Sequence, residues 1–333
     1  MKQIIEDLKN PDALPEKTAK VDVVQTHISV VFVADSFVYK IKKPVNFGFL
    51  DFSTLEKRKH YCHQEVTLNR RLARDLYVDV LPVSLVMGKY YTLIGQGGEP
   101  VEYAVKMKRI PDDRLMKSLF EAGKVTPEHL VEIAKVLSEF HSGARTSSEI
   151  AQYAEPEKFK INTDENFQQV QGHCGLTISK QQFRDIQAYT NDFYKTHRNL
   201  FFKRIDDGRI RDCHGDLHME HVCLMTGLPI IDCIEFNERF RYSDAIADIA
   251  FLLMDLEFHG GMDDARVLWN HYKDLSKEAH VGHLLKFYKV YRAFVRGKVN
   301  GFQIDDPAIG DGEKAEAIRR AKSYFNLAHD YIS

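Results

Sequence analysis

One stretch, residues 210–251, constrains the fold of this chain more than any other. It reads IRDCHGDLHMEHVCLMTGLPIIDCIEFNERFRYSDAIADIAF. Two apolar runs, 222–224 and 228–234, flank a short turn at 226–227, a pattern that predicts a tight β-hairpin. The two ends of a hairpin meet in space, so we expect the polar residues around it to gather at one mouth. These residues are Asp216, His221, Asp232 and Glu235.

Clustered carboxylates predict a cation at this mouth. Carboxylates at the end of apolar strands repel each other unless a positive charge lies between them. Phosphoryl transfer uses one acid to receive the proton of an acceptor hydroxyl and other acids to hold a divalent ion on the nucleotide phosphates. The stretch is typical of that chemistry, and Asp216 is the first candidate for the acid that orients the acceptor.

Two segments of this stretch resemble a known family. HGDLH at 214–218 resembles the catalytic loop of the aminoglycoside phosphotransferase-like kinases, which are related to choline and protein kinases. DIAF at 248–251 resembles the segment whose Asp, here Asp248, braces that loop from a helix. The resemblance covers most of the chain from about Val21 and implies that His214 and His218 brace and orient the loop. It implies ATP and Mg²⁺ as cofactors.

The segment IEFN at 234–237, together with the N-terminal sequence, resembles a bacterial subgroup whose kinase-like part is often fused to a P-loop ATPase. No GxxxxGK[ST] motif occurs in the sequence, so we expect that fusion partner to be absent. By this resemblance Glu235 takes the place of the family's metal-binding acid. Asp232 is the alternative, and the sequence leaves the choice between them open.

His221 departs from the family pattern, because it stands five residues after Asp216, where the family usually has a metal-binding Asn. Imidazole suits zinc or manganese better than magnesium, so Mn²⁺ is an alternative to Mg²⁺ here. Two other functions stay open. One is a pseudokinase that binds nucleotide without turnover. The other is a zinc or di-metal hydrolase built from His214, Asp216, His218 and His221, which would leave Lys40 and Glu65 without a role.

The N-terminal part alternates as strands do. Apolar runs from Val21 to about residue 107 predict a five-stranded antiparallel sheet with one main helix. Lys40 lies in the third run, FVYKIKK, where a buried lysine needs an anionic partner. Ser53 and Glu56 form an expected capping box for the helix that follows. On that helix Glu65 shares a stripe with apolar residues, so we expect it to pair with Lys40; Lys42 is the alternative lysine.

Nucleotide contacts are expected at two further places in this part. The join between the first two strands contains no glycine, so the hydroxyl of Ser29 is the candidate that covers the nucleotide. Met107 and Arg109 lie at the end of the last strand, where a hinge backbone would meet the adenine. We therefore expect an N-terminal nucleotide-binding lobe at 1–109 and a C-terminal catalytic and acceptor-binding lobe at 110–333.

Beyond residue 110 the apolar period changes from 2 to 3.6, which predicts a mostly helical lobe. Residues 127–142 form a clear amphipathic helix, whereas the polar stretch 145–180 predicts loops and short helices. The fold is therefore expected to be α+β and kinase-like, with two lobes. Four basic residues in this lobe are candidate acceptor contacts: Arg239, Arg241, Arg292 and Arg296.

Composition restricts the binding partners and the cellular compartment that we expect. The net charge of −2 gives no support for binding nucleic acid or a membrane surface. The N-terminus lacks an apolar signal segment, and the five cysteines form no CxxC pair, which favours reduced thiols in the cytoplasm. We expect a phosphotransferase acting on an alcohol group of a small molecule such as a sugar, an amino alcohol or an aminoglycoside. Oligomeric state and the choice between ATP and GTP stay open.

Overall fold

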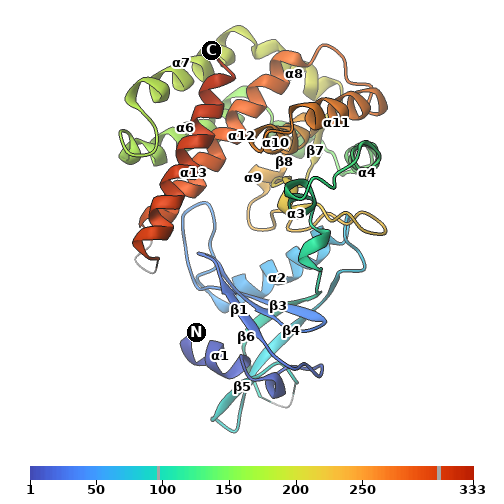
Figure 1. The fold of residues 1–333 in the computed structure, drawn as a ribbon, viewed down its shortest axis with the longest axis vertical. Helices are drawn as coiled ribbons and strands as arrows, with labels where there is room; N and C mark the ends of the chain where they lie inside the picture. Colours follow the sequence, from blue (N-terminus) through green and yellow to red (C-terminus); the bar gives the residue numbers. More distant parts are fainter. Residues whose placement is uncertain (96–97, 306–308) are drawn as a thin grey trace. The chain divides into compact units, whose positions relative to one another are not determined.

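The computed structural model describes residues 1–95, 98–305 and 309–333, and the chain divides into two compact units (Figure 1). Unit 1 comprises Met1–Lys124 and Glu220–Glu238, and unit 2 comprises Val125–Met219 and Arg239–Ser333. Unit 1 therefore extends beyond the boundary expected near Arg109 and includes a segment that the sequence assigned to the second lobe. Backbone bonds explain this, because Met116 N donates to Val222 O and Leu224 N to Arg114 O, each at 2.8 Å.

Unit 1 is built on one antiparallel sheet of six strands in the order β1-β2-β3-β6-β4-β5, where we expected five. The strands are β1 (Asp22–Gln25), β2 (Ser29–Val33), β3 (Phe37–Lys42), β4 (Tyr77–Val86), β5 (Tyr90–Thr92) and β6 (Pro100–Lys108). The helices are α1 (Lys2–Leu8), α2 (Leu55–Asn69) and α3 (Met116–Glu121). Since β3 lies between β2 and β6, it is an internal strand, and none of its residues lies at an edge of the sheet.

Helix α2 begins one residue later than the sequence predicted. Thr54 is its N-cap and accepts a bond from Lys57 N at 3.3 Å, so the capping box expected from Ser53 is wrong. The buried face of α2 carries Cys62 and Val66, which pack in one cluster with Val105 of β6. This packing fixes the helix against the sheet and turns Glu65, on the same buried face, toward β3.

The predicted hairpin after residue 220 is present but irregular. Val222 pairs with Ile230 as a single bridge, flanked by bonds from Cys223 N to Pro229 O and from Ile231 N to His221 O, each at 2.9 Å. Beyond the bridge the second arm bonds to side chains instead of to a strand: Asp232 N donates to the Tyr77 hydroxyl at 3.1 Å, and Cys233 N to Asn69 Oδ1 at 2.9 Å. The predicted tight hairpin is therefore limited to this bridge, because the second arm bonds to α2 and β4.

Unit 2 is mostly helical (Figure 1). Its two short strands, β7 (Ile210–Asp212) and β8 (Tyr242–Asp244), pair antiparallel. Its helices are α4 (Pro127–Gly143), α5 (Ser148–Gln152), α6 (Pro156–Val170), α7 (Lys180–Thr196), α8 (Arg198–Asp206), α9 (Glu238–Arg241, whose first residue belongs to unit 1), α10 (Ala245–Phe258), α11 (Met262–Leu275), α12 (Gly282–Phe302) and α13 (Asp311–Asp330).

Helix α6 corrects the expectation of loops and short helices at 145–180. Pro156 starts this 15-residue helix at a position where proline is favoured. Its buried face carries Asn162, Thr163 and Asn166 beside Phe159 and Phe167. Buried polar residues interrupt the apolar period, so the sequence pattern did not reveal the helix.

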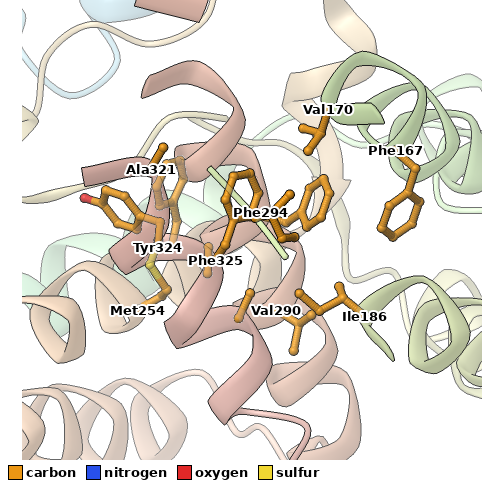
Figure 2. Packing of buried hydrophobic residues seen from close by; sticks show 13 residues of the cluster. Phe167, Val170, Ile186, Met254, Val290, Phe294, Ala321, Tyr324 and Phe325 are labelled. Carbon is orange, nitrogen blue, oxygen red and sulfur yellow. The ribbon is translucent and has the colours of Figure 1, made fainter. Parts of the chain in front are cut away.

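One apolar cluster of unit 2 joins four helices around α12 (Figure 2). Val290 and Phe294 of α12 pack with Phe325 of α13, and residues of α6, α7 and α10 complete the cluster. The two long helices approach so closely that a Cβ at Gly297 would lie 2.8 Å from the Phe325 ring. This core gives α10 and α12 a rigid base, and the loop at 214–218 is bonded to both helices. In the described ranges, no helix combines the length and apolar character that a bilayer span requires.

Candidate functional site

Two lysines of β3 point toward the same glutamate of α2. Lys40 and Lys42 are two residues apart and therefore share one face of the strand. Lys42 Nζ donates to Glu65 Oε2 at 2.6 Å, and Lys40 Nζ lies 3.0 Å from Glu65 Oε1. The contact expected between Lys40 and Glu65 is present. Lys42 is only 1% exposed, and both lysines that the sequence offered as partners of Glu65 contact it.

Two acids that follow the hairpin complete this group, one on each lysine. Glu235 is buried and bonds to Lys42. Asp232 has a side chain that is 43% exposed, and it accepts a bond from Lys40 at 2.8 Å. Its backbone lies in the left-handed region at φ 61°, a conformation that is uncommon for a residue other than glycine. His221 Nε2 lies 3.5 Å from Asp232 Oδ2, so these two predicted residues do meet.

The charges of this group, which we name the lysine–acid cluster (Lys40, Lys42, Glu65, Asp232, Glu235), are strongly coupled. Burial alone would raise the pKa of Glu65, but the two lysines hold it below its ordinary value. Burial raises the pKa of Glu235 despite its bond to Lys42. Burial would lower the pKa of Lys40, yet the surrounding acids, Asp232 first, raise it well above its ordinary value. Two lysines therefore face three acids, and the accessible acid is Asp232.

The other residues expected to bind nucleotide lie at three places in unit 1. Ser29 is 1% exposed, and its hydroxyl has no hydrogen-bond partner in the part of the chain that the structure describes. Met107 of β6 packs beside the cluster of α2 and β6. Arg109 donates from its backbone to Ser36 O at 2.9 Å and from its guanidinium to Ala34 O at 3.3 Å, so it fastens the turn between β2 and β3.

In unit 2 the loop 214–218 is held by one buried acid of α10. Asp248 accepts bonds from His214 N at 2.6 Å and from Gly215 N at 2.9 Å. His141 Nε2 of α4 lies 3.3 Å from the same carboxylate. Burial would raise the pKa of Asp248, but the bond to His141 and the nearby charges of His141, His214 and Arg292 lower it to about 2. Asp248 therefore stays ionised and holds the loop backbone.

The loop presents Asp216 beside basic side chains. Asp216 is 34% exposed, and its Oδ2 lies 3.5 Å from His218 Nε2. Arg296 of α12 lies 3.5 Å from the same nitrogen of His218. Arg292, four residues earlier on that helix, donates to Gly215 O at 2.8 Å and to Ala247 O at 3.2 Å. The predicted loop residues and the two α12 arginines are thus brought together in one unit.

The four candidate acceptor arginines differ in what they bind. Arg241 is 4% exposed and bonds to Asp212, and Arg292 is 5% exposed and holds the loop backbone. Burial this deep fits a positioning role better than contact with an acceptor. Arg239 makes a two-pronged contact with Glu165 of α6 at 3.0 and 2.6 Å.

Three supporting side chains were not assigned their roles by the sequence. His141 of α4 contacts the Asp248 carboxylate. Asn69 and Tyr77 hold the backbone on either side of Asp232, as described above. A polar residue at the end of a helix and a tyrosine at the start of a strand are common, so the sequence carries no signal that marks these two.

Solved structures share this fold over nearly the whole chain. A putative aminoglycoside phosphotransferase from Ralstonia eutropha superposes with a TM-score of 0.55, covering 94% of this chain and 92% of that one at 12% identity. A choline/ethanolamine kinase family protein from Mesorhizobium loti gives 0.50, with the same coverage and 13% identity. The fold is that of the aminoglycoside phosphotransferase-like kinases. The predicted kinase-like α+β fold is thereby confirmed.

Sequence relatives of this kinase-like chain occur in mycobacteria. An uncharacterized protein of Mycobacterium tuberculosis is 35% identical over 280 residues, which are 84% of this chain and 54% of the relative, and one of Mycobacterium bovis matches equally. The chain spans about half the length of the curated relatives it matches. No protein-family profile matches the chain.

Proposed function

We propose that this kinase-like protein is an ATP-dependent, metal-requiring phosphotransferase that acts on a hydroxyl of a small molecule. The observation that carries the proposal is the position of Lys40, which joins Glu65 of α2 to the exposed acid Asp232. A lysine held by a helix glutamate beside a metal-binding acid is the arrangement that kinases use to position nucleotide phosphates. In this proposal unit 1 binds the nucleotide.

Asp232 is our choice for the main metal ligand, ahead of Glu235. Its carboxylate is accessible, and oxygen ligands of this kind suit magnesium. Its left-handed backbone supports the choice, because sparsely populated conformations concentrate at functional positions. Glu235 is instead buried against Lys42. A divalent ion bound with ATP would neutralise the phosphate charge, and Lys40 would then share its charge between Asp232 and the phosphates.

Asp216 is our candidate for the residue that orients the acceptor hydroxyl in unit 2. It sits on a loop whose backbone is fixed by Asp248 and Arg292, so its direction is set before the substrate arrives. The carboxylate would accept the hydrogen of the acceptor alcohol and align its oxygen for transfer. We propose sugars, amino alcohols and aminoglycosides as the acceptor classes to screen first.

The test begins with binding. Thermal unfolding would be followed with a non-hydrolysable ATP analogue, alone and with Mg²⁺, Mn²⁺ or Zn²⁺, on the wild type, Asp216→Asn and Lys40→Met. Ligands that bind only the folded state raise the melting temperature. We expect nucleotide with Mg²⁺ or Mn²⁺ to stabilise the wild type and Asp216→Asn but not Lys40→Met. Stabilisation by Zn²⁺ alone, with no nucleotide effect, would contradict the proposal and support the hydrolase alternative.

A pseudokinase is the second candidate function, and the position of His221 favours it. This histidine lies 3.5 Å from Asp232, at the acid that we assign to the metal. An imidazole there weakens the preference for magnesium. Acceptor-dependent ADP formation by the wild type and by His221→Asn separates the cases. Turnover that appears only in His221→Asn favours a pseudokinase, whereas turnover that the substitution reduces favours an active enzyme adapted to manganese.

A further inference from the structure

A pocket lies in unit 2, between α4, the end of α11 and the strand β7. Its volume is about 520 Å³, which falls within the range of small-molecule sites in proteins. All of its lining residues belong to unit 2, and of the residues that we place in the network around Asp248 it includes His141. The pocket requires an explanation of its own.

The charges around this pocket are mostly positive. Four of its lining residues are cationic and two are acidic: Lys135, Arg209, Arg211 and Lys277 against Glu139 and Glu278. Glu278 is paired with two cations: Arg204, which also binds Asp244, donates to both of its oxygens at 2.5 and 3.0 Å, and Arg209 lies 3.5 Å from it. Lys135 and Lys277 are exposed and form no ion pair with any residue that the structure describes. The surplus of positive charge suits an anionic ligand.

The backbone at the rim supports a binding role. Lys277 follows the end of α11 and has φ 54°, in the left-handed region that is uncommon for a lysine. Arg209 donates to Ser276 O at 3.0 Å, which ties this segment to the residue just before β7. Arg211 of β7 donates one hydrogen bond to Ala144 O at 3.0 Å. A guanidinium has five donors, so others are available to a phosphate or carboxylate.

The floor of the pocket connects to the loop at 214–218. His141 and Tyr272 both line the pocket, and His141 Nδ1 lies 2.8 Å from the Tyr272 hydroxyl. On its other side His141 Nε2 contacts the Asp248 carboxylate, which holds the amides of His214 and Gly215. The Tyr272 hydroxyl is therefore three contacts away from the loop backbone.

We propose that this pocket, lined by Lys135, Arg211 and Lys277, binds a small anionic molecule bearing phosphate or carboxylate groups, and that its occupancy stiffens the loop 214–218 through Tyr272 and His141. The ligand is an effector and is distinct from the nucleotide and the acceptor. Binding at the pocket does not depend on phosphotransfer, so the inference stands or falls separately from the proposed function.

The experiment measures anion binding in a pocket variant and a charge-matched control. The pocket variant is Lys135→Glu/Lys277→Glu, and the control is Lys286→Glu/Lys322→Glu, which changes two exposed lysines of α12 and α13 outside the pocket. Inorganic phosphate and citrate would be titrated into the full chain while the melting temperature is followed. We expect a saturable rise in the wild type and the control, and at least a tenfold weaker affinity in the pocket variant.

Hydrogen exchange tests the connection to the loop. We expect the anion that binds to slow exchange of the His214 and Gly215 amides in the wild type. Tyr272→Phe should keep the binding but lose most of this protection, since it removes the hydroxyl that contacts His141. Equal anion responses in the pocket variant and the control would overturn the site. A response lost only in Lys40→Met would place the anion at the nucleotide phosphates and overturn it too, and protection that persists in Tyr272→Phe would overturn the route.

Discussion

The two units hold their buried acids by different means. In unit 1, Glu65 and Glu235 are neutralised by lysine side chains. In unit 2, Asp248 is held by two backbone amides and by His141, with Arg292 nearby. One arrangement depends on long flexible cations and the other on fixed backbone donors.

This difference matches what each unit is proposed to do. A lysine has a single charge on a flexible stem, so Lys40 can turn from Asp232 toward an arriving phosphate with little cost. Backbone amides cannot turn away without breaking the loop, so Asp248 sets a geometry and does not exchange partners. The lysine–acid cluster is therefore suited to binding charge, and the Asp248 network to positioning Asp216.

The largest expected effect comes from removing the buried cation of unit 1. Lys42→Met leaves Glu65 and Glu235 with one lysine less in a buried site, which costs about 3–5 kcal/mol of unfolding free energy. Urea unfolding of the purified chain measures this. The control is Lys43→Met, which removes only a bond to Thr26 O. Lys42→Met/Glu235→Gln restores the original net charge of the lysine–acid cluster and should recover part of the loss. Equal stability of the Lys42 and Lys43 variants would mean that the bonds of Lys42 to Glu65 and Glu235 do not stabilise the cluster.

Asp248→Asn tests the amide-based network and should cost less, about 1–3 kcal/mol, because the shape is kept while one amide acceptor and the charge are lost. Its distinctive result is local. We expect faster hydrogen exchange at His214 and Gly215, beyond that expected from the global loss. Asp263→Asn, at a carboxylate that is 86% exposed, serves as the control. Unchanged exchange at the two amides would show that Asp248 does not fix the loop.

Sequence patterns predicted contacts best where the spacing of apolar residues and the expected pairing of charges indicated the same arrangement. The alternation of β3 and the helical stripe of α2 were enough to pair Lys40 with Glu65. They could not decide which of Lys40 and Lys42 is buried and which is accessible, because both lie on one face of the strand. That difference depends on the segments that cover each lysine. The sequence could not choose between Asp232 and Glu235 for the same reason. Their exposure and the backbone conformation of Asp232 depend on contacts that are distant in sequence, such as those with Tyr77 and Asn69.

The sequence predicted least where polar residues are buried. Helix α6 was missed because Asn162 and Asn166 occupy its inner face, so its apolar period is broken. The hairpin was predicted from two apolar runs, whereas its second arm bonds to polar side chains that are distant in sequence. The pocket lined by Lys135 and Lys277 gave no signal in the sequence, since these residues come together only through the packing of α4 against α11.

Lys40→Met sharpens the comparison inside unit 1. Because Lys40 is partly exposed and Lys42 still neutralises Glu65, the cost in unfolding free energy should be about 1 kcal/mol, well below that of Lys42→Met. Its binding effect should be the larger one, with nucleotide affinity reduced at least tenfold. Urea unfolding and nucleotide titration on the same samples separate the two. A stability loss as large as that of Lys42→Met would remove the distinction between a binding lysine and a buried one.

The smallest effect expected is an opposite response of the two acids to pH. The pKa of Asp248 is lowered to about 2 from 3.8, so its stabilisation is complete above pH 3.8 and is lost as pH falls toward 2. Burial raises the pKa of Glu235 above 4.5, so in the folded chain it takes up a proton before the unfolded chain does, and stability gains as pH falls toward 4.5.

Unfolding free energies of the wild type, Asp248→Asn and Glu235→Gln between pH 7 and pH 3 test these signs. The advantage of the wild type over Asp248→Asn should stay constant down to about pH 4 and then shrink, because only the ionised carboxylate accepts both amides. Relative to Glu235→Gln, the wild type should instead become more stable as pH falls from 7 toward 4.5, because protonation relieves the cost of a buried charge that the variant never carries. Parallel profiles for the two pairs would mean that the lysines of unit 1 hold Glu235 as firmly ionised as the amides of unit 2 hold Asp248.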